Sequence, residues 1–170
     1  PEAAEIVTTA DMLDWLNRGY NPLIPVSRPV NYEVTYKYPC CIPPYTLGVL
    51  LGDGCLSTRN NVGYSSHQDD TETDRNIELD GYEVKRANSD QQAVKFSNKD
   101  QRKVLVDTLD RLGLIGTYSH TKFIPREYLF RSTDERIALL QGLMDTDGTV
   151  GADGDSLGFT TTSERLLGDV

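Results

Sequence analysis

The sequence predicts an α+β fold made of two similar halves, of which the second is incomplete. An apolar stretch that ends in Asp-Gly occurs twice, at residues 46–54 and again at residues 140–148. A helix, strand, strand, helix order follows the first copy and begins again after the second. Far fewer residues follow the second copy than separate the two. A repeat at this long interval indicates two related halves that share one site on a pseudo-twofold axis.

The region before the first copy is predicted to hold one helix and one strand. Thr8 or Thr9 caps a short helix that Gly19 ends. A proline-rich connector follows at residues 23–29. Residues 30–37 alternate apolar and polar side chains, which is the pattern of a strand.

The elements after the first copy can be read from turn and cap residues. We expect a hairpin with strands near residues 55–57 and 62–66, and further strands within residues 81–96. Asn98 or Ser97 begins a helix that Gly113 ends.

The elements around the second copy follow from a capping pattern. Ser132 and Glu135 have the spacing of a capping box, which predicts the start of the helix that carries the second copy. Strands are expected near residues 149–151 and 157–162, and Ser163 begins a last helix.

The net charge of −9 argues against an ordinary nucleic-acid-binding domain, whose surface is basic. The acidic excess is concentrated in residues 67–80, which we predict to be a solvated loop. Its acids are Asp69, Asp70, Glu72, Asp74, Glu78 and Asp80. The rest of the chain is closer to neutral.

Composition also excludes several classes of protein. No apolar run is long enough to cross a membrane, and the first residues do not resemble a signal or transit peptide. Three cysteines, with Cys40 and Cys41 adjacent, do not form a disulfide framework, and His67 and His120 lack zinc-site spacing. We therefore expect an intracellular protein of the cytoplasm or nucleoid.

Each copy of the repeat has a glycine inside its helix. Gly48 and Gly142 each cost about 1 kcal/mol relative to alanine at such a position. Glycine is tolerated there when two helix backbones approach closely. The two helices are therefore predicted to cross at these glycines.

The repeat also places an aspartate at the C-terminal end of each helix. Asp53 and Asp147 follow helix ends that already carry about half a negative charge. A divalent cation would neutralise this charge, and carboxylate, carbonyl and water oxygens suit Mg²⁺. A metal with open positions is the arrangement for phosphodiester hydrolysis. The alternative is a pair of core helices that end in ordinary Asp-Gly turns.

The second copy resembles the signature of the LAGLIDADG homing endonucleases, and residues 46–54 resemble it more loosely. The matching residues are Leu140, Gly142, Leu143, Asp145, Asp147 and Gly148. Other segments resemble the form embedded in inteins: Lys122 with residues 123–129, the strand-to-helix step at residues 159–163, and the segments 8–13 and 24–25.

The resemblance implies two αββαββα lobes packed through the repeated helices, as a monomer with pseudo-twofold symmetry. Residues 1–42 would connect to an intein splicing domain, residues 43–131 would form the first lobe, and residues 132–170 would begin the second. The implied partners are double-stranded DNA, held in its major groove by the sheets, and the remainder of the intein and host polypeptide.

The resemblance also implies site residues for Mg²⁺-dependent cleavage of both DNA strands. The metal would be held by the side chains of Asp53 and Asp147 and by the carbonyls of Gly52 and Thr146. Lys122 would be the basic residue of the active centre. Phosphate contacts are expected, from their place in predicted strands or hairpins, for Arg59, Lys85, Arg86 and Lys95.

Two alternatives remain on the same scaffold. One is a non-cleaving DNA- or RNA-binding module, such as a maturase or a transcription regulator. The other is a degenerate, structural intein insert, to which the acidic segment would be no obstacle. Residue 1 is proline and no His-Asn pair ends the sequence, so these residues alone do not have the ends that self-splicing needs. Asp145 is expected to support the helix end rather than bind metal.

Overall fold

The computed structural model describes residues 6–23, 28–32, 42–86 and 93–170. The chain divides into two compact units, Pro1–Val30 and Asn31–Val170. In the described part of the first unit lies the helix α1 (Thr9–Asn17), which Thr8 caps through reciprocal hydrogen bonds with Asp11. The strand predicted at residues 30–37 and the cysteines Cys40 and Cys41 lie largely or wholly outside the described residues, as does most of the connector.

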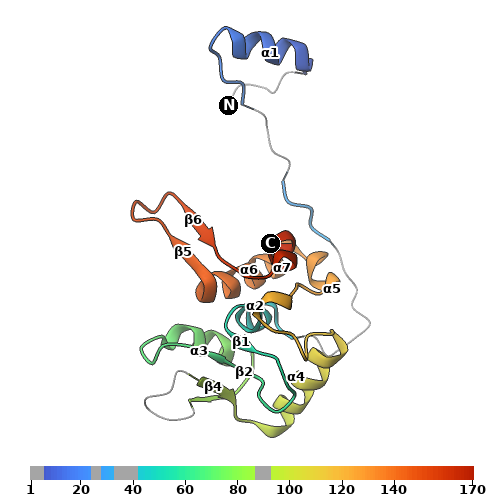
Figure 1. The fold of residues 1–170 in the computed structure, drawn as a ribbon, viewed down its shortest axis with the longest axis vertical. Coiled ribbons are helices and arrows are strands. Elements are labelled where there is room, and N and C mark those ends of the chain that lie inside the picture. The colour runs from blue at the N-terminus through green and yellow to red at the C-terminus, as the bar shows by residue number, and fades with distance from the viewer. Residues whose placement is uncertain (1–5, 24–27, 33–41, 87–92) are drawn as a thin grey trace. The chain divides into compact units, whose positions relative to one another are not determined.

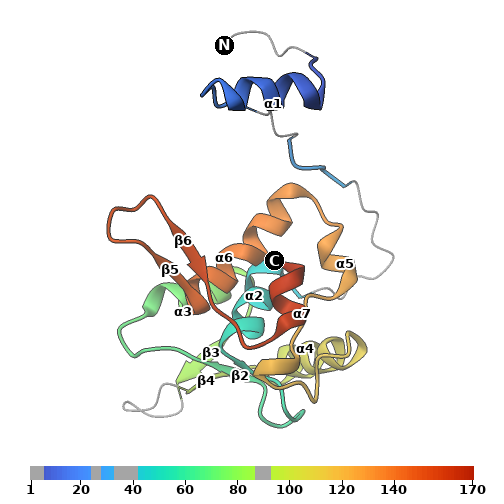
Figure 2. The same ribbon diagram turned by 45° about the horizontal axis from the view of Figure 1, so that its top comes forward.

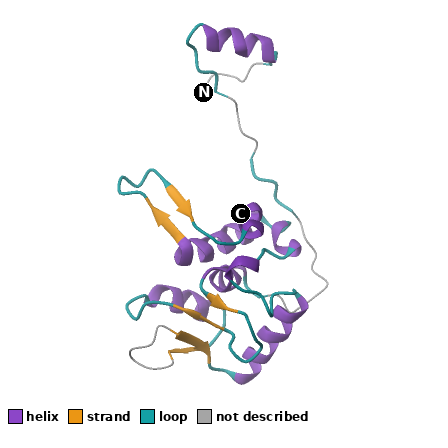
Figure 3. Cartoon of the chain, in the orientation of Figure 1, coloured by secondary structure: helices purple, strands orange, loops and turns teal. Residues whose placement is uncertain are grey.

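The second unit is α+β with antiparallel sheets, as predicted. Figure 3 shows its helices and strands. The first run is α2 (Pro44–Gly52), β1 (Gly54–Cys55), β2 (Gly63–Ser65), α3 (Thr71–Leu79), β3 (Val84–Arg86), β4 (Ala93–Phe96) and α4 (Lys99–Arg111). The short helices η1 (Ser119–Thr121) and α5 (Arg126–Leu129) follow. The second run is α6 (Thr133–Asp147), β5 (Gly148–Val150), β6 (Leu157–Phe159) and α7 (Glu164–Asp169).

The first run forms a four-stranded antiparallel sheet in the order β1-β2-β4-β3. Tyr64 pairs with Gly54 on one side and with Val94 on the other, and its ring is buried with Val94 and Phe96 in the core. The second run forms the two-stranded hairpin β5–β6, in which Gly148 pairs with Phe159. The predicted hairpins are therefore confirmed, with shorter strands.

Helices α2 and α6 lie side by side in the middle of the second unit. Figures 1 and 2 show this pair between the four-stranded sheet, with α3 and α4, and the β5–β6 hairpin with α7. The side chains of α2 are almost all buried, which fits its nearly uninterrupted apolar sequence. The helix pair is thus the common core of the two repeated halves.

The prediction of a solvated loop at residues 67–80 was wrong. Asp70 caps α3 by accepting the backbone N–H of Thr73, and the acids of its first turn favour a helix N-terminus. Ile77 is fully buried and fixes this helix against the core. A single apolar residue among many acids gave little sign of this packing in the sequence.

The acidic segment also caps the motif helix α2. Pro43, at the cap position of α2, makes no side-chain cap hydrogen bond. Instead Asp80 Oδ2 accepts hydrogen bonds from the backbone nitrogen and hydroxyl of Thr46, at 3.1 and 2.6 Å. Asp80 thus supplies from a distant part of the chain the carboxylate that α2 lacks locally.

Candidate active site

The two motif helices meet through backbone contacts at the paired glycines, as predicted. A β-carbon on Gly48 would collide with the carbonyl oxygen of Leu139 and lie 3.0 Å from the Cα of Gly142. A β-carbon on Gly142 would collide with the carbonyl oxygen of Tyr45. Because the obstacles are backbone atoms, only glycine permits this approach at either position.

This approach brings together the C-terminal ends of both helices. Asp53 is the cap residue that ends α2, and Asp147 is the last residue of α6. A β-carbon on Gly52 would lie 2.8 Å from Thr146 Cβ and 3.3 Å from Asp147 Oδ2. The four residues expected to hold a metal, Gly52, Asp53, Thr146 and Asp147, are therefore neighbours across the helix pair.

Lys122 enters the same site from the segment between η1 and α5. Its Nζ donates a hydrogen bond of 2.6 Å to the carbonyl oxygen of Gly52, and the residue is only 4% exposed. Burial lowers the pKa of Lys122 to about 8, although the nearby carboxylates of Asp147 and Asp53 favour the charged form. A buried ammonium group thus lies beside both acids.

The two aspartates respond to the same surroundings. Burial raises the pKa of Asp53, the charge of Asp147 raises it further, and Lys122 opposes both effects. Burial also raises the pKa of Asp147, again against the influence of Lys122. The site thus concentrates negative charge and holds one positive charge that partly offsets it.

The donor set fits a hard divalent cation that keeps several water ligands. Within the described residues no group of three or more His, Cys, Asp or Glu side chains could hold a metal ion. The site offers the carboxylates of Asp53 and Asp147 together with helix-end carbonyls. Mg²⁺ in proteins is often held by one or two carboxylates, with waters completing the shell. The Gly52 carbonyl oxygen accepts a hydrogen bond from Lys122 Nζ and has a second lone pair for a metal. The residues present therefore fit the expected Mg²⁺.

The four basic residues expected at DNA fall into two kinds. Lys85 and Lys95 pair directly across β3 and β4 and are both exposed. Arg86 is half-buried, pairs with Asp74 and donates to the carbonyl oxygens of Ser66 and Asp70.

Arg59 lies in the β1–β2 loop and forms ion pairs with Asp107 and Asp110 of α4. The structure thus brings Lys85 and Lys95 together on the open face of the sheet. Both arginines, in contrast, form ion pairs with acidic side chains of the same chain.

Sequence reasoning missed a side-chain link between the motif helices. The Tyr45 hydroxyl donates a 2.7 Å hydrogen bond to Asp145 Oδ2, and burial is the main cause that raises the pKa of Tyr45 to about 12. Asp145 therefore joins the last turn of α6 to the first turn of α2. No local pattern reveals this pair, because the two residues meet only after the helices cross.

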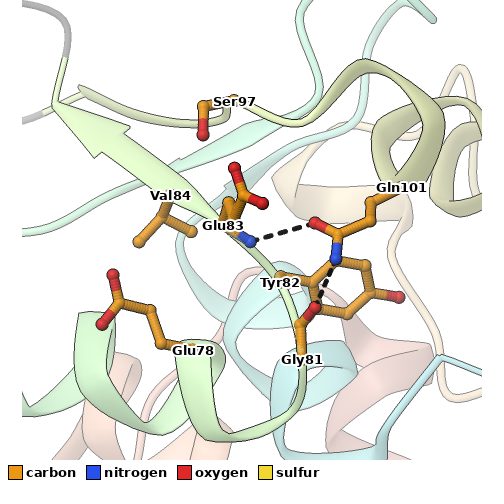
Figure 4. Close-up of a pocket in the computed structure, with 7 residues that line it drawn as sticks. All are labelled: Glu78, Gly81, Tyr82, Glu83, Val84, Ser97 and Gln101. Atoms are coloured by element: carbon orange, nitrogen blue, oxygen red, sulfur yellow. Dashed lines mark hydrogen bonds between the residues drawn. The ribbon is translucent and has the colours of Figure 1, made fainter.

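A separate surface hollow of about 460 Å³ lies between α3, β3 and α4. Figure 4 shows Gln101 spanning it: its side chain accepts the Glu83 N–H and donates to the Gly81 carbonyl. Its other lining residues are Glu78, Tyr82, Val84 and Ser97. No residue of the Asp53–Asp147 site lines this hollow, and its acids are unsuited to phosphate.

Residues 134–170 match the model of a LAGLIDADG-like domain. A curated relative, the replicative DNA helicase DnaB of Mycobacterium intracellulare, is 37% identical over 130 residues. The aligned stretch covers 76% of this chain and 18% of that relative, so the chain spans less than a fifth of its length.

The domain match supports a relationship to the LAGLIDADG homing endonuclease family, and the helicase match gives weak support for an intein context. Among the described residues, no helix is long and apolar enough to cross a membrane.

Proposed function

We propose that this chain is the endonuclease part of an intein and acts on intracellular double-stranded DNA, with a replicative helicase as host protein. In this proposal residues 1–42 connect to a splicing domain, residues 43–131 form the first lobe and residues 132–170 begin the second. The similarity to a DnaB helicase motivates the choice of host. The observation that carries the proposal is the meeting of two helix ends, each with an aspartate, beside a buried lysine.

The proposed chemistry is hydrolysis of a phosphodiester in each strand. Asp53 and Asp147 would hold Mg²⁺ with the carbonyls of Gly52 and Thr146; bound there, Mg²⁺ would activate water and polarise phosphate oxygens. Lys122 would stabilise the negative charge that develops on the phosphate, from a buried position where charges interact strongly. Lys85 and Lys95 would position DNA by phosphate contacts. Phosphate contacts by Arg59 and Arg86 would require these side chains to leave their ion pairs with acids of the chain.

Plasmid cleavage tests this proposal. The substrate carries a helicase gene without the intein, and a plasmid with the interrupted gene serves as the non-cleaved comparison. We expect Mg²⁺-dependent double-strand cleavage that Asp147→Asn abolishes and Asp153→Asn preserves, because Asp153 is an exposed acid of the β5–β6 loop. Cleavage by the Asp147→Asn chain at the original rate would refute the assignment of this site.

The observed ion pairs also favour a second candidate, a structural insert that no longer binds DNA. Arg59 and Arg86 pair with acids of the chain, and the whole chain is acidic. Fluorescence anisotropy at several salt concentrations separates the two. A DNA-binding domain should lose about two units of its log–log salt slope in the Lys85→Ala, Lys95→Ala double variant. The exposed Lys103 of α4, replaced by alanine, is the matched control; no binding by the parent chain at low salt would favour the insert.

A further inference from the structure

Three consecutive residues beginning at Lys122 contact the last helix, α7. The Ser163 hydroxyl donates a 2.7 Å hydrogen bond to the carbonyl oxygen of Lys122. Asp169 Oδ2 accepts the backbone N–H of Ile124 at 2.9 Å. Between these two bonds, the guanidinium of Arg165 lies 3.8 Å from the centre of the Phe123 ring.

The Ser163 contact is buried, and the Asp169 contact is partly buried. Ser163 is 1% exposed, and its hydroxyl also accepts the N–H of Leu166 as the cap of α7. Leu166 is likewise buried and packs this helix onto the core. The buried hydroxyl of Ser163 is both donor and acceptor. Loss of either partner would leave an unpaired buried polar group, which lowers stability. The backbone of residues 122–124 is therefore held at two points.

The contact joins the two repeated halves. Lys122 belongs to the segment that ends the first half, while α7 follows the β5–β6 hairpin of the second. The side chain of Lys122 donates its hydrogen bond to the Gly52 carbonyl at the end of α2. The backbone of this short segment thus contacts α7, while the side chain of Lys122 reaches the site of the paired aspartates.

We propose that α7 is a positioning element: Ser163 and Asp169 fix the backbone at Lys122 and Ile124 so that the Lys122 ammonium reaches the site of Asp53 and Asp147. This inference rests on the function proposed above for Lys122. The second half then contributes more than its own aspartate, because it also places the lysine of the first half.

Asp169 offers a matched pair of variants. Asp169→Asn keeps an oxygen that can accept the Ile124 N–H, whereas Asp169→Ala removes the acceptor. Ser163→Ala tests the other bond, so the inference stays testable when one variant does not fold. Ser132→Ala removes a comparable cap from α6, with no contact to Lys122, and controls for a general loss of stability.

Two measurements need no nuclease activity. We expect acylation of Lys122 by an amine-reactive acetylating reagent, followed by mass spectrometry, to rise about tenfold in Asp169→Ala and Ser163→Ala. Amide exchange at Ile124, followed by NMR, should accelerate in Asp169→Ala. Both should remain near the parent values in Asp169→Asn and Ser132→Ala. Unchanged labelling and exchange in Asp169→Ala and Ser163→Ala would overturn the positioning role.

Cleavage kinetics separate this inference from the proposed function. We expect Asp169→Ala to lower kcat with little change in KM, with Asp169→Asn restoring the rate. Higher Lys122 labelling in Asp169→Ala, together with full cleavage by a Lys122→Ala chain, would support the positioning and refute the catalytic role of Lys122.

Discussion

The two repeated halves carry the same motif, yet equivalent residues after it have opposite surroundings. Leu56 and Val150 each lie two residues beyond the glycine of their Asp-Gly pair, and they are 1% and 65% exposed. In the first half β4, β3 and α4 continue the fold around the hairpin, whereas β5 and β6 form a two-stranded sheet. A two-stranded hairpin alone is marginally stable, so the packing partners, not the motif, decide burial here.

Charge differs between the halves as well. The open face of the first sheet carries Lys85 and Lys95 as a direct cross-strand pair. Residues 148–162 contain no lysine or arginine and include Asp153 and Asp155. Under the proposed function, a phosphate backbone would therefore be attracted mainly to the first half.

The largest expected effect comes from the junction that both halves share. Gly142→Ala should destabilise the fold by about 3 kcal/mol, because the new methyl group meets backbone atoms of α2. Chemical denaturation followed by circular dichroism measures this. Gly168→Ala in α7 is the control, since nothing lies within 4 Å of its added carbon. Equal stability of the two variants would show that the helices do not depend on this close approach.

The difference in burial predicts unequal costs at equivalent positions. Leu56→Ala should cost about 3 kcal/mol, because it leaves a cavity in the core. Val150→Ala should cost less than about 0.5 kcal/mol, because that side chain is largely exposed. Urea denaturation of both variants gives the comparison. A cost at Val150 as large as at Leu56 would mean that the second hairpin is packed in solution.

The buried Lys122, which interacts with the aspartates of both halves, predicts a pH dependence of stability. Its pKa is lowered from 10.5 to about 8 by folding, so above pH 8 the unfolded chain holds a proton that the folded chain has released. The free energy of unfolding should therefore rise from pH 8 towards pH 9.5, whereas below pH 7 this lysine adds a constant destabilisation that does not change with pH. The difference curve between the parent and Lys122→Met isolates the effect. Parallel curves for the two proteins would contradict it.

A further difference between the halves concerns how the two motif helices begin. Helix α6 has its own cap in Ser132, whereas α2 depends on the distant Asp80. Ser132→Ala and Asp80→Ala should each cost about 1 kcal/mol. Hydrogen exchange should distinguish them, because only Asp80→Ala should increase exchange in α3 as well as in α2. Exchange confined to α2 in that variant would show that the cap does not hold α3.

The local elements could be predicted because their signals are local. Thr8, Ser132 and Asn98 cap their helices as expected, and the glycines of the motif predicted the helix crossing. Proximity of the two Asp-Gly ends followed from that crossing. The role of each site residue stays a prediction.

What could not be predicted depends on contacts between distant segments. Asp80 caps α2 from 34 residues away, and Ser163 bonds Lys122 from 41 residues away. The helix at residues 71–79 needed the buried Ile77, whose partners are supplied only by the folded core. The ion pairs of Arg59 and Arg86 have the same origin, because their acidic partners lie in other elements.

The direct backbone contact at Gly48 and Gly142 has a consequence for how such a molecule can change. The approach of the two acid-bearing helices is set by main-chain atoms, which every variant that keeps these two glycines shares. Under the proposed function, strand residues such as Lys85 could be exchanged to suit new DNA targets while the spacing of the two aspartates stays constant. Recognition and cutting would thus evolve, or be redesigned, as separate modules.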